Sequence, residues 1–190
     1  EVARGLPTAV TVGASTPDFG RDWAALLHGS SFRAYYTADL VGAQLGGAVK
    51  NVLAIACGMA DGLGLGNNTR AALITRGLAE LMRLGEAMGC RTRTLMGLAG
   101  MGDLVLTCTG SLSRNRHVGI ELGKGRSLGE IIDGMQMVAE GVETVLATFH
   151  LGRRLKVKMP ITNEVYAILQ EGKSARAAIE DLMARTLVEE

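Results

Sequence analysis

The sequence predicts a mainly α-helical fold preceded by a short α/β segment, and three observations support this. Alternating β-branched and aromatic residues are confined to Pro7–Gly13 and Ser31–Thr37. From Asp39 onward, apolar residues recur at helical spacing. The 190 residues include 26 glycines and only 3 prolines, which is typical of closely packed helices with glycine-made turns and contacts. Because the periodicity changes near Ala38, we expect two parts, residues 1–38 and residues 39–190.

The first part is predicted to contain two strands and one helix. Pro7–Gly13 is a short β-branched run, and Ser31–Thr37 is rich in aromatic and β-branched residues, so both are predicted strands. Thr16 and Pro17 have the residue types of an N-cap and a first helical turn. We therefore expect a helix between the strands that ends near Leu27.

The second part is predicted to be helical almost throughout. Ser127 followed by Glu130 has the spacing of a capping box, which marks one helix start. The expected helices are Asp39 to about Leu63, Asn67–Met88, Arg91–Leu98, Asp103–Thr109, Ser113–Leu122, Ser127–Asp133, Ala139–Leu155, Ile161–Gln170 and Ala175–Ala184.

Composition indicates a globular protein and argues against several classes of partner. Apolar residues make up 47% of the chain and charged residues 21%, which excludes a disordered chain. The net charge of +1 provides no global field for nucleic acid or an anionic membrane. Charged residues interrupt the longest apolar stretch, Leu45–Leu65, so we expect no membrane insertion. Three cysteines without metal-ligand spacing predict reduced thiols, a cytoplasmic protein and no metal site.

Lys50 and Asn51 are polar residues within a segment that otherwise reads as a buried helix. Polar groups in such surroundings cost free energy unless they are paired or used. A positioned lysine can donate a proton, so this segment suggests a site that protonates a bound ligand. The alternative is an ordinary lysine that extends its ammonium group to solvent.

Asp103 and the tripeptide Ser113-Arg114-Asn115 are the other polar candidates. Asp103 is the lone charge in its segment, and Thr107, one helical turn later, is expected to point the same way. An aspartate after glycine is also a common helix cap. Ser113, Arg114 and Asn115 fall at a predicted helix start, where free backbone N–H groups and a guanidinium bind phosphate readily. A solvated cap with exposed arginines is the alternative.

Three longer stretches make the chain recognisable: GGAVKNVLAIACGMADGLGLGNNTRAALITRGLAE, GLAGMGDLVLTCTGSLSRNRHVG and MVAEGVETV. They fall in order at compatible spacing over essentially the whole chain. On these residues the chain resembles the bacterial NAD(P)-dependent glycerol-3-phosphate dehydrogenases. The resemblance implies a C-terminal helical substrate domain of the 6-phosphogluconate dehydrogenase C-terminal-like type, preceded by the last two strands and a helix of a Rossmann domain. Because the chain lacks that family's Gly-rich loop, residues 1–38 are expected to be the remnant of the dinucleotide-binding domain.

The resemblance also implies an activity and its site residues. The activity is reversible hydride transfer between NAD(P)H and dihydroxyacetone phosphate, giving sn-glycerol 3-phosphate for phospholipid synthesis. Lys50 is the implied general acid/base, and NAD or NADP is the implied cofactor. The implied substrate-binding residues are Lys50, Asn51, Asp103, Thr107, Ser113, Arg114 and Asn115. The implied cofactor-binding residues are Arg114, Val138 and Glu140.

Two other interpretations remain open on the sequence. A hydroxyacid or ketopantoate reductase would share the helical domain but would not need the phosphate-binding tripeptide. A non-catalytic helical interaction module would not depend on Lys50. A homodimer is expected from the Gly- and Ala-rich helices, and the chain by itself is expected to be inactive.

Overall fold

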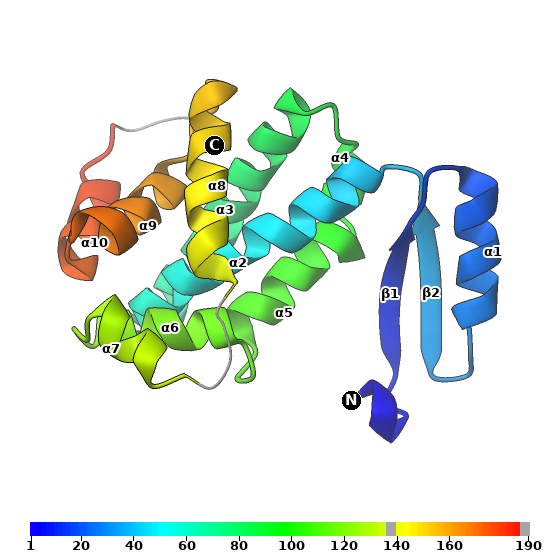
Figure 1. The fold of residues 1–190 in the computed structure, drawn as a ribbon, viewed down its shortest axis with the longest axis horizontal. Coiled ribbons are helices and arrows are strands. Elements are labelled where there is room, and N and C mark those ends of the chain that lie inside the picture. The colour runs from blue at the N-terminus through cyan, green and yellow to red at the C-terminus, as the bar shows by residue number, and fades with distance from the viewer. Residues whose placement is uncertain (136–139, 187–190) are drawn as a thin grey trace.

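The computed structural model describes residues 1–135 and 140–186. A small α/β part is followed by a larger body of packed helices (Figure 1). Strands β1, Thr8–Gly13, and β2, Phe32–Thr37, pair in parallel with Thr8 opposite Phe32. Helix α1, Pro17–Leu27, connects them, and a single helical turn, η1, Val2–Arg4, precedes β1.

The expected start of α1 is confirmed. The Thr16 hydroxyl accepts a hydrogen bond from the backbone N–H of Phe19, and Pro17 occupies the first helical turn. Proline suits this position because its missing N–H would have no partner inside the helix. Two strands and one helix therefore form where the local sequence signals predicted them.

The rest of the described chain is helical, as the periodicity predicted. One described helix, α2, is by itself long and apolar enough to cross a membrane, but 61% of its most apolar window is buried inside the protein. It lies at the centre of the helical body and contacts α3, α5, α6, α8 and α9 (Figure 1). The helices are α2, Leu40–Gly62; α3, Gly66–Ala87; α4, Thr92–Leu95; η2, Leu98–Gly102; α5, Asp103–Thr109; α6, Arg114–Gly123; α7, Leu128–Asp133; α8, Gly141–Arg154; α9, Pro160–Glu171; and α10, Ala175–Met183.

The helix expected at Arg91–Leu98 is wrong in extent. Helix α4 ends at Leu95, and the chain then forms a π-helical turn, η2, that leads directly into α5. Glycines at 97, 100 and 102 weaken the preference for a regular helix. At Gly100 a side chain would lie 2.0 Å from the Leu95 carbonyl oxygen, so the turn needs a glycine there. The predicted helix start at Ala139 lies outside the described residues.

Helices α2 and α6 pack with their backbones in contact. A Cβ at Gly58 would lie 2.1 Å from the Arg116 carbonyl oxygen, and one at Gly119 would lie 2.1 Å from the Ile55 carbonyl oxygen. Gly62 and Gly123 continue the same contact one turn further along. Small residues four apart on both helices allow this close approach. The contact fixes α6, and with it the residues at its N-terminus, against α2.

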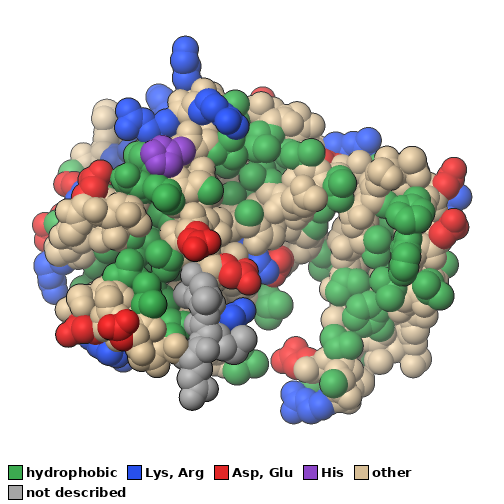
Figure 2. All heavy atoms as spheres, viewed as in Figure 1, with side chains coloured by type: hydrophobic (Ala, Val, Ile, Leu, Met, Phe, Trp, Pro, Cys, Tyr) green, Lys and Arg blue, Asp and Glu red, His purple; other side chains and the backbone are tan. Residues whose placement is uncertain are grey.

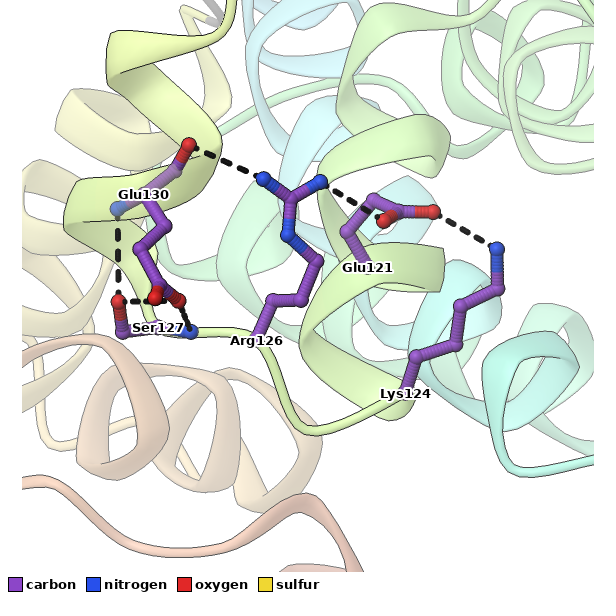
Figure 3. Close-up of polar contacts among 5 residues, drawn as sticks. All are labelled: Glu121, Lys124, Arg126, Ser127 and Glu130. Atoms are coloured by element: carbon purple, nitrogen blue, oxygen red, sulfur yellow. Dashed lines mark hydrogen bonds and ion pairs between the residues drawn. The ribbon is translucent and has the colours of Figure 1, made fainter.

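Two sets of polar interactions hold α9 and α7 in place. The fully buried carboxylate of Glu80 accepts hydrogen bonds from the backbone N–H groups of Ile161 and Thr162 and from the Thr162 hydroxyl, so it caps α9 from another helix. Figure 3 shows the link between α6 and α7, in which Arg126 bonds both Glu121 and the Glu130 carbonyl. The capping box predicted at Ser127 and Glu130 is confirmed. Burial raises the pKa of Glu80, and the hydrogen bonds it accepts oppose that shift.

Candidate active site

The central feature of the site is an ion pair between Lys50 and Asp103. The Lys50 Nζ atom lies 2.7 Å from Oδ1 and 2.6 Å from Oδ2 of Asp103, although the residues are 53 positions apart. Lys50 comes from the middle of α2 and Asp103 from the first residue of α5. The two side chains are 23% and 31% exposed. The pair is therefore partly screened from water while remaining open to a ligand.

Asp103 does not act as a helix cap. The residue before it, Gly102, already has helical backbone angles, and no side chain caps the start of α5. The turn η2 runs into α5 without a break, so the backbone N–H groups there have helical partners. The carboxylate is thus available for Lys50. The Thr107 hydroxyl lies 2.7 Å from the Asp103 carbonyl and 3.3 Å from Oδ1, which confirms that both residues share one face.

Asn51 lies beside Lys50 but faces the interior, with 8% of its surface exposed. Within the described residues it makes no hydrogen bond to Lys50 or Asp103. Consecutive residues on a helix point about 100° apart, so a residue next to Lys50 need not share its surroundings. The geometry places Asn51 at the edge of the ion pair rather than within it.

The tripeptide Ser113-Arg114-Asn115 divides into three different environments. Ser113 is the N-cap of α6 and accepts a hydrogen bond from the Arg116 backbone N–H at 3.2 Å. Arg114 is exposed at the first helical position. Asn115 is 8% exposed, and its Oδ1 accepts a hydrogen bond from the backbone N–H of Gly141 at 2.9 Å. One helix start therefore carries an exposed arginine and a buried asparagine.

Arg116 is not the exposed arginine that the cap interpretation predicted. Its guanidinium lies 2.7 Å from Oδ2 of Asp61, whose other oxygen bonds Arg70 at 2.8 Å. The Arg116 and Asp61 side chains are only 17% and 13% exposed. This cluster ties α6 to the C-terminal end of α2. Nothing in the local sequence identified it, because the two charges are 55 positions apart.

Glu140 precedes α8 and is exposed. Its side chain makes no capping hydrogen bond to the start of α8. Val138, the other residue implied in cofactor binding, lies outside the described residues. The hydrogen bond between Asn115 and Gly141 brings the beginning of α8 next to the beginning of α6. Arg114 and Glu140 therefore belong to adjacent helix starts.

Two of the cysteines lie close together in the interior. Cys57 and Cys108 are buried neighbours on α2 and α5. A hydrogen bond to Cys57, together with burial, raises the pKa of the Cys108 thiol far above its usual range. A thiol in this state is a poor nucleophile. Among the described residues no group of three His, Cys, Asp or Glu side chains could hold a metal ion.

A cavity of about 610 Å³ lies between the two strands and the turn η2, lined in part by Tyr35, Tyr36, Arg93 and Leu98. None of the predicted site residues lines it. The Lys50–Asp103 ion pair is the better candidate for the active site, because it brings an ammonium and a carboxylate together from two different helices.

The fold defines a helical domain that carries a partly exposed lysine–carboxylate pair and, at the start of α6, a serine N-cap followed by an exposed arginine. Residues 39–180 match the family described as NAD-dependent glycerol-3-phosphate dehydrogenase C-terminus, so the chain belongs to that family. The resemblance stated from the sequence is confirmed.

Individual relatives agree with the family match. The chain is 57% identical over 187 residues to a protein of Geobacter sp. (strain M21) and 56% identical over 190 residues to one of Oleidesulfovibrio alaskensis, both named glycerol-3-phosphate dehydrogenase (NAD(P)+). These matches cover 98% and 100% of the chain but 56% and 58% of the relatives. The chain thus spans little more than half of their length. A crystal structure of glycerol-3-phosphate dehydrogenase from Coxiella burnetii superposes with a TM-score of 0.93 at 45% identity, covering 97% of this chain and 57% of that one.

Proposed function

We propose that this chain is the substrate-binding and proton-transferring half of an NAD(P)-dependent glycerol-3-phosphate dehydrogenase. The reaction interconverts dihydroxyacetone phosphate and sn-glycerol 3-phosphate, which supplies glycerol phosphate for phospholipid synthesis. The observation that carries the proposal is the Lys50–Asp103 ion pair, with Nζ 2.6 Å from the carboxylate. Such a pair has no capping role here and is only partly exposed, so binding a polar substrate is the use that best accounts for it.

Lys50 is the proposed general acid. A bound nicotinamide nucleotide supplies the hydride, and negative charge then develops on the carbonyl oxygen of the substrate. The Lys50 ammonium stabilises that charge and transfers one proton from Nζ to the oxygen; the reverse reaction returns the proton to the amine. Asp103 holds the ammonium in place, since both of its carboxylate oxygens accept hydrogen bonds from Nζ. Thr107 in turn restrains the carboxylate through its contact with Oδ1.

The start of α6 is the proposed phosphate site. A helix N-terminus carries partial positive charge and free backbone N–H groups, and a guanidinium offers a bidentate partner for phosphate oxygens. Ser113 already uses its hydroxyl as a cap, so we assign it a supporting role through the backbone. Arg114 provides the charge, and the largely buried amides of Asn115 and Asn51 are the proposed further polar contacts. This assignment agrees with the exposure of Arg114.

Arg114 and Glu140 are the proposed contacts to the cofactor, with Val138 as the third. The two charged residues fit a nicotinamide nucleotide by their chemistry. A guanidinium pairs with a phosphate oxygen, and a carboxylate accepts hydrogen bonds from amide or hydroxyl groups. Their positions at adjacent helix starts support a shared ligand. The cofactor is NAD or NADP.

We propose that residues 1–38 belong to a dinucleotide-binding domain and residues 39–190 to the substrate domain. The family match beginning at residue 39 supports this division. Apolar side chains gather over α1 and the strands (Figure 2), where Phe19, Trp23 and Leu26 are 54%, 45% and 73% exposed. A surface this apolar favours further protein packed against it.

The protein is proposed to act in the cytoplasm as a homodimer. Its free cysteines are consistent with a reducing compartment. Gly58 and Gly62 of α2 are used within the chain, against α6, and Gly46 packs against η2, so these glycines do not support the dimer interpretation. Light scattering of the purified full-length protein measures its mass and decides between monomer and dimer.

The test uses a chimera in which this chain replaces the matching C-terminal part of the Geobacter sp. relative. We expect NADH oxidation with dihydroxyacetone phosphate and far less with dihydroxyacetone, which lacks the phosphate. Lys50→Ala should lower kcat by about a hundredfold or more, within the range that general acid catalysis contributes. Lys50→Arg should not restore it, because arginine keeps its proton. A folded Lys50→Ala chimera with a normal kcat would remove Lys50 from the mechanism.

A further inference from the structure

One buried hydrogen bond connects the two helix starts that form the proposed site. The Gly141 backbone N–H, at the first residue of α8, donates to Oδ1 of Asn115 at 2.9 Å across 26 positions of sequence. The first N–H groups of a helix have no partner inside it and need an external acceptor. Glu140 does not supply that acceptor with its side chain. Asn115 therefore caps α8 from a neighbouring helix.

The contact is tight enough to require glycine at position 141. A Cβ there would lie 2.6 Å from Oδ1 and 2.9 Å from Cγ of Asn115, and 3.0 Å from Cδ1 of Ile55. Any larger residue at 141 would displace the Asn115 amide.

The hydrogen bond also determines which end of the Asn115 amide faces the surface. An asparagine amide accepts through its oxygen and donates through its nitrogen. A backbone N–H can pair only with the oxygen, so Oδ1 points inward to Gly141. Nδ2 makes no hydrogen bond within the described residues. The end of the amide that turns away from Gly141 is thus the donor, on the residue next to Arg114.

We propose that the Gly141 backbone orients the Asn115 amide so that its NH₂ donors face the substrate phosphate. Gly141 is then a positioning residue for phosphate recognition, although its own side chain contacts no ligand. A freed amide can rotate its oxygen toward the anion, which loses a donor and adds repulsion. This inference rests on the proposed function, since the anion is the phosphate of that substrate.

Three variants of the chimera test the proposal. Gly141→Ala displaces the amide sterically. Asn115→Asp keeps an oxygen for Gly141 and replaces the NH₂ donor with a second, negatively charged oxygen. Gly129→Ala is the matched control, because a Cβ at that helical glycine of α7 meets nothing within 4 Å. For each variant, KM and kcat are measured with dihydroxyacetone phosphate and with dihydroxyacetone, together with the melting temperature.

We expect Gly141→Ala to raise KM for dihydroxyacetone phosphate about tenfold or more, as loss of a hydrogen bond to a charged group predicts. Its kcat should change far less, because the bond acts in the ground state and the transition state alike. Asn115→Asp should raise KM further while melting near wild type. Neither variant should alter kcat/KM for dihydroxyacetone by a comparable factor. Gly129→Ala should behave as wild type.

A positioning role is overturned if Gly141→Ala lowers the melting temperature but leaves KM for the phosphorylated substrate unchanged. If Gly141→Ala fails to fold, the test rests on Asn115→Asp. An unchanged KM of the Asn115→Asp chimera for dihydroxyacetone phosphate then refutes the inference. An unmodified chimera that does not reduce dihydroxyacetone phosphate overturns the proposed function and this inference with it. An active chimera in which Gly141→Ala matches Gly129→Ala overturns only the positioning role.

Discussion

The backbone contact between α2 and α6 makes Gly119→Ala a sharp test of the fold. The new Cβ would lie 2.1 Å from the Ile55 carbonyl oxygen and 2.9 Å from the Gly58 Cα, whereas ordinary contact begins at 3.4 Å. Both obstacles are helix backbone and cannot rotate away. The helices must therefore move apart by more than an ångström, or α6 must unwind locally.

The expected cost follows from two opposing terms. Overpacking a well-packed contact destabilises by about 1–3 kcal/mol, and backbone obstacles place this case at the upper end. Replacing glycine by alanine within a helix recovers up to about 1 kcal/mol. We expect a net loss of about 2 kcal/mol, which lowers the melting temperature by roughly 4–8 °C for a chain of this size.

The assay is urea and thermal unfolding of the 190-residue chain followed by circular dichroism, with Gly129→Ala as control. The control adds the same methyl group where the structure has open space, so it should be neutral or slightly stabilising. Gly58→Ala meets the same contact from the other helix, 2.1 Å from the Arg116 carbonyl oxygen. Combined with Gly119→Ala it should cost less than the sum, because helices already separated accommodate both methyl groups. A Gly119→Ala midpoint equal to that of the control would refute the close approach.

Two further predictions concern single charged residues. Arg114→Ala should raise KM of the chimera for dihydroxyacetone phosphate by about tenfold to a hundredfold, since a charged partner of phosphate is lost; an equal effect from Arg176→Ala, an exposed arginine on α10, would contradict a specific role. Burial raises the pKa of Glu80 above its ordinary value of 4.5, so the folded state binds this proton more tightly than the unfolded state. The free energy of unfolding should therefore fall as the pH rises from about 4.5 through the pKa of the folded state. Glu80→Gln should remove this dependence of the unfolding free energy on pH. If the unfolding free energies of wild type and variant change with pH by the same amount over this range, the shift is disproved.

Local sequence was sufficient for the elements and for the candidate polar residues. Thr16, Ser113 and Ser127 cap helices as predicted, because a cap depends on residues only two or three positions away. The change from period two to helical spacing near Ala38 likewise depends on neighbouring residues. Lys50 and Asp103 stood out because each is a lone charge in an apolar run.

What each polar group contacts depended on the packing of helices. The sequence left Asp103 between a cap and a site carboxylate, and the smooth passage from η2 into α5 removed the need for a cap. Arg114 and Arg116 are equivalent in composition, but only Arg116 faces α2 and reaches Asp61. The distinction lies in the rotation of α6, which the glycine contact with α2 sets.

The partners of Glu80, Asn115 and Lys50 lie 81, 26 and 53 positions away in the chain. No local periodicity encodes such pairings, because they arise only when helices pack at a particular separation and angle. The sequence therefore determined which groups are costly to leave unpaired in the interior. The tertiary structure alone decided which of them pair with each other and which remain directed toward a ligand.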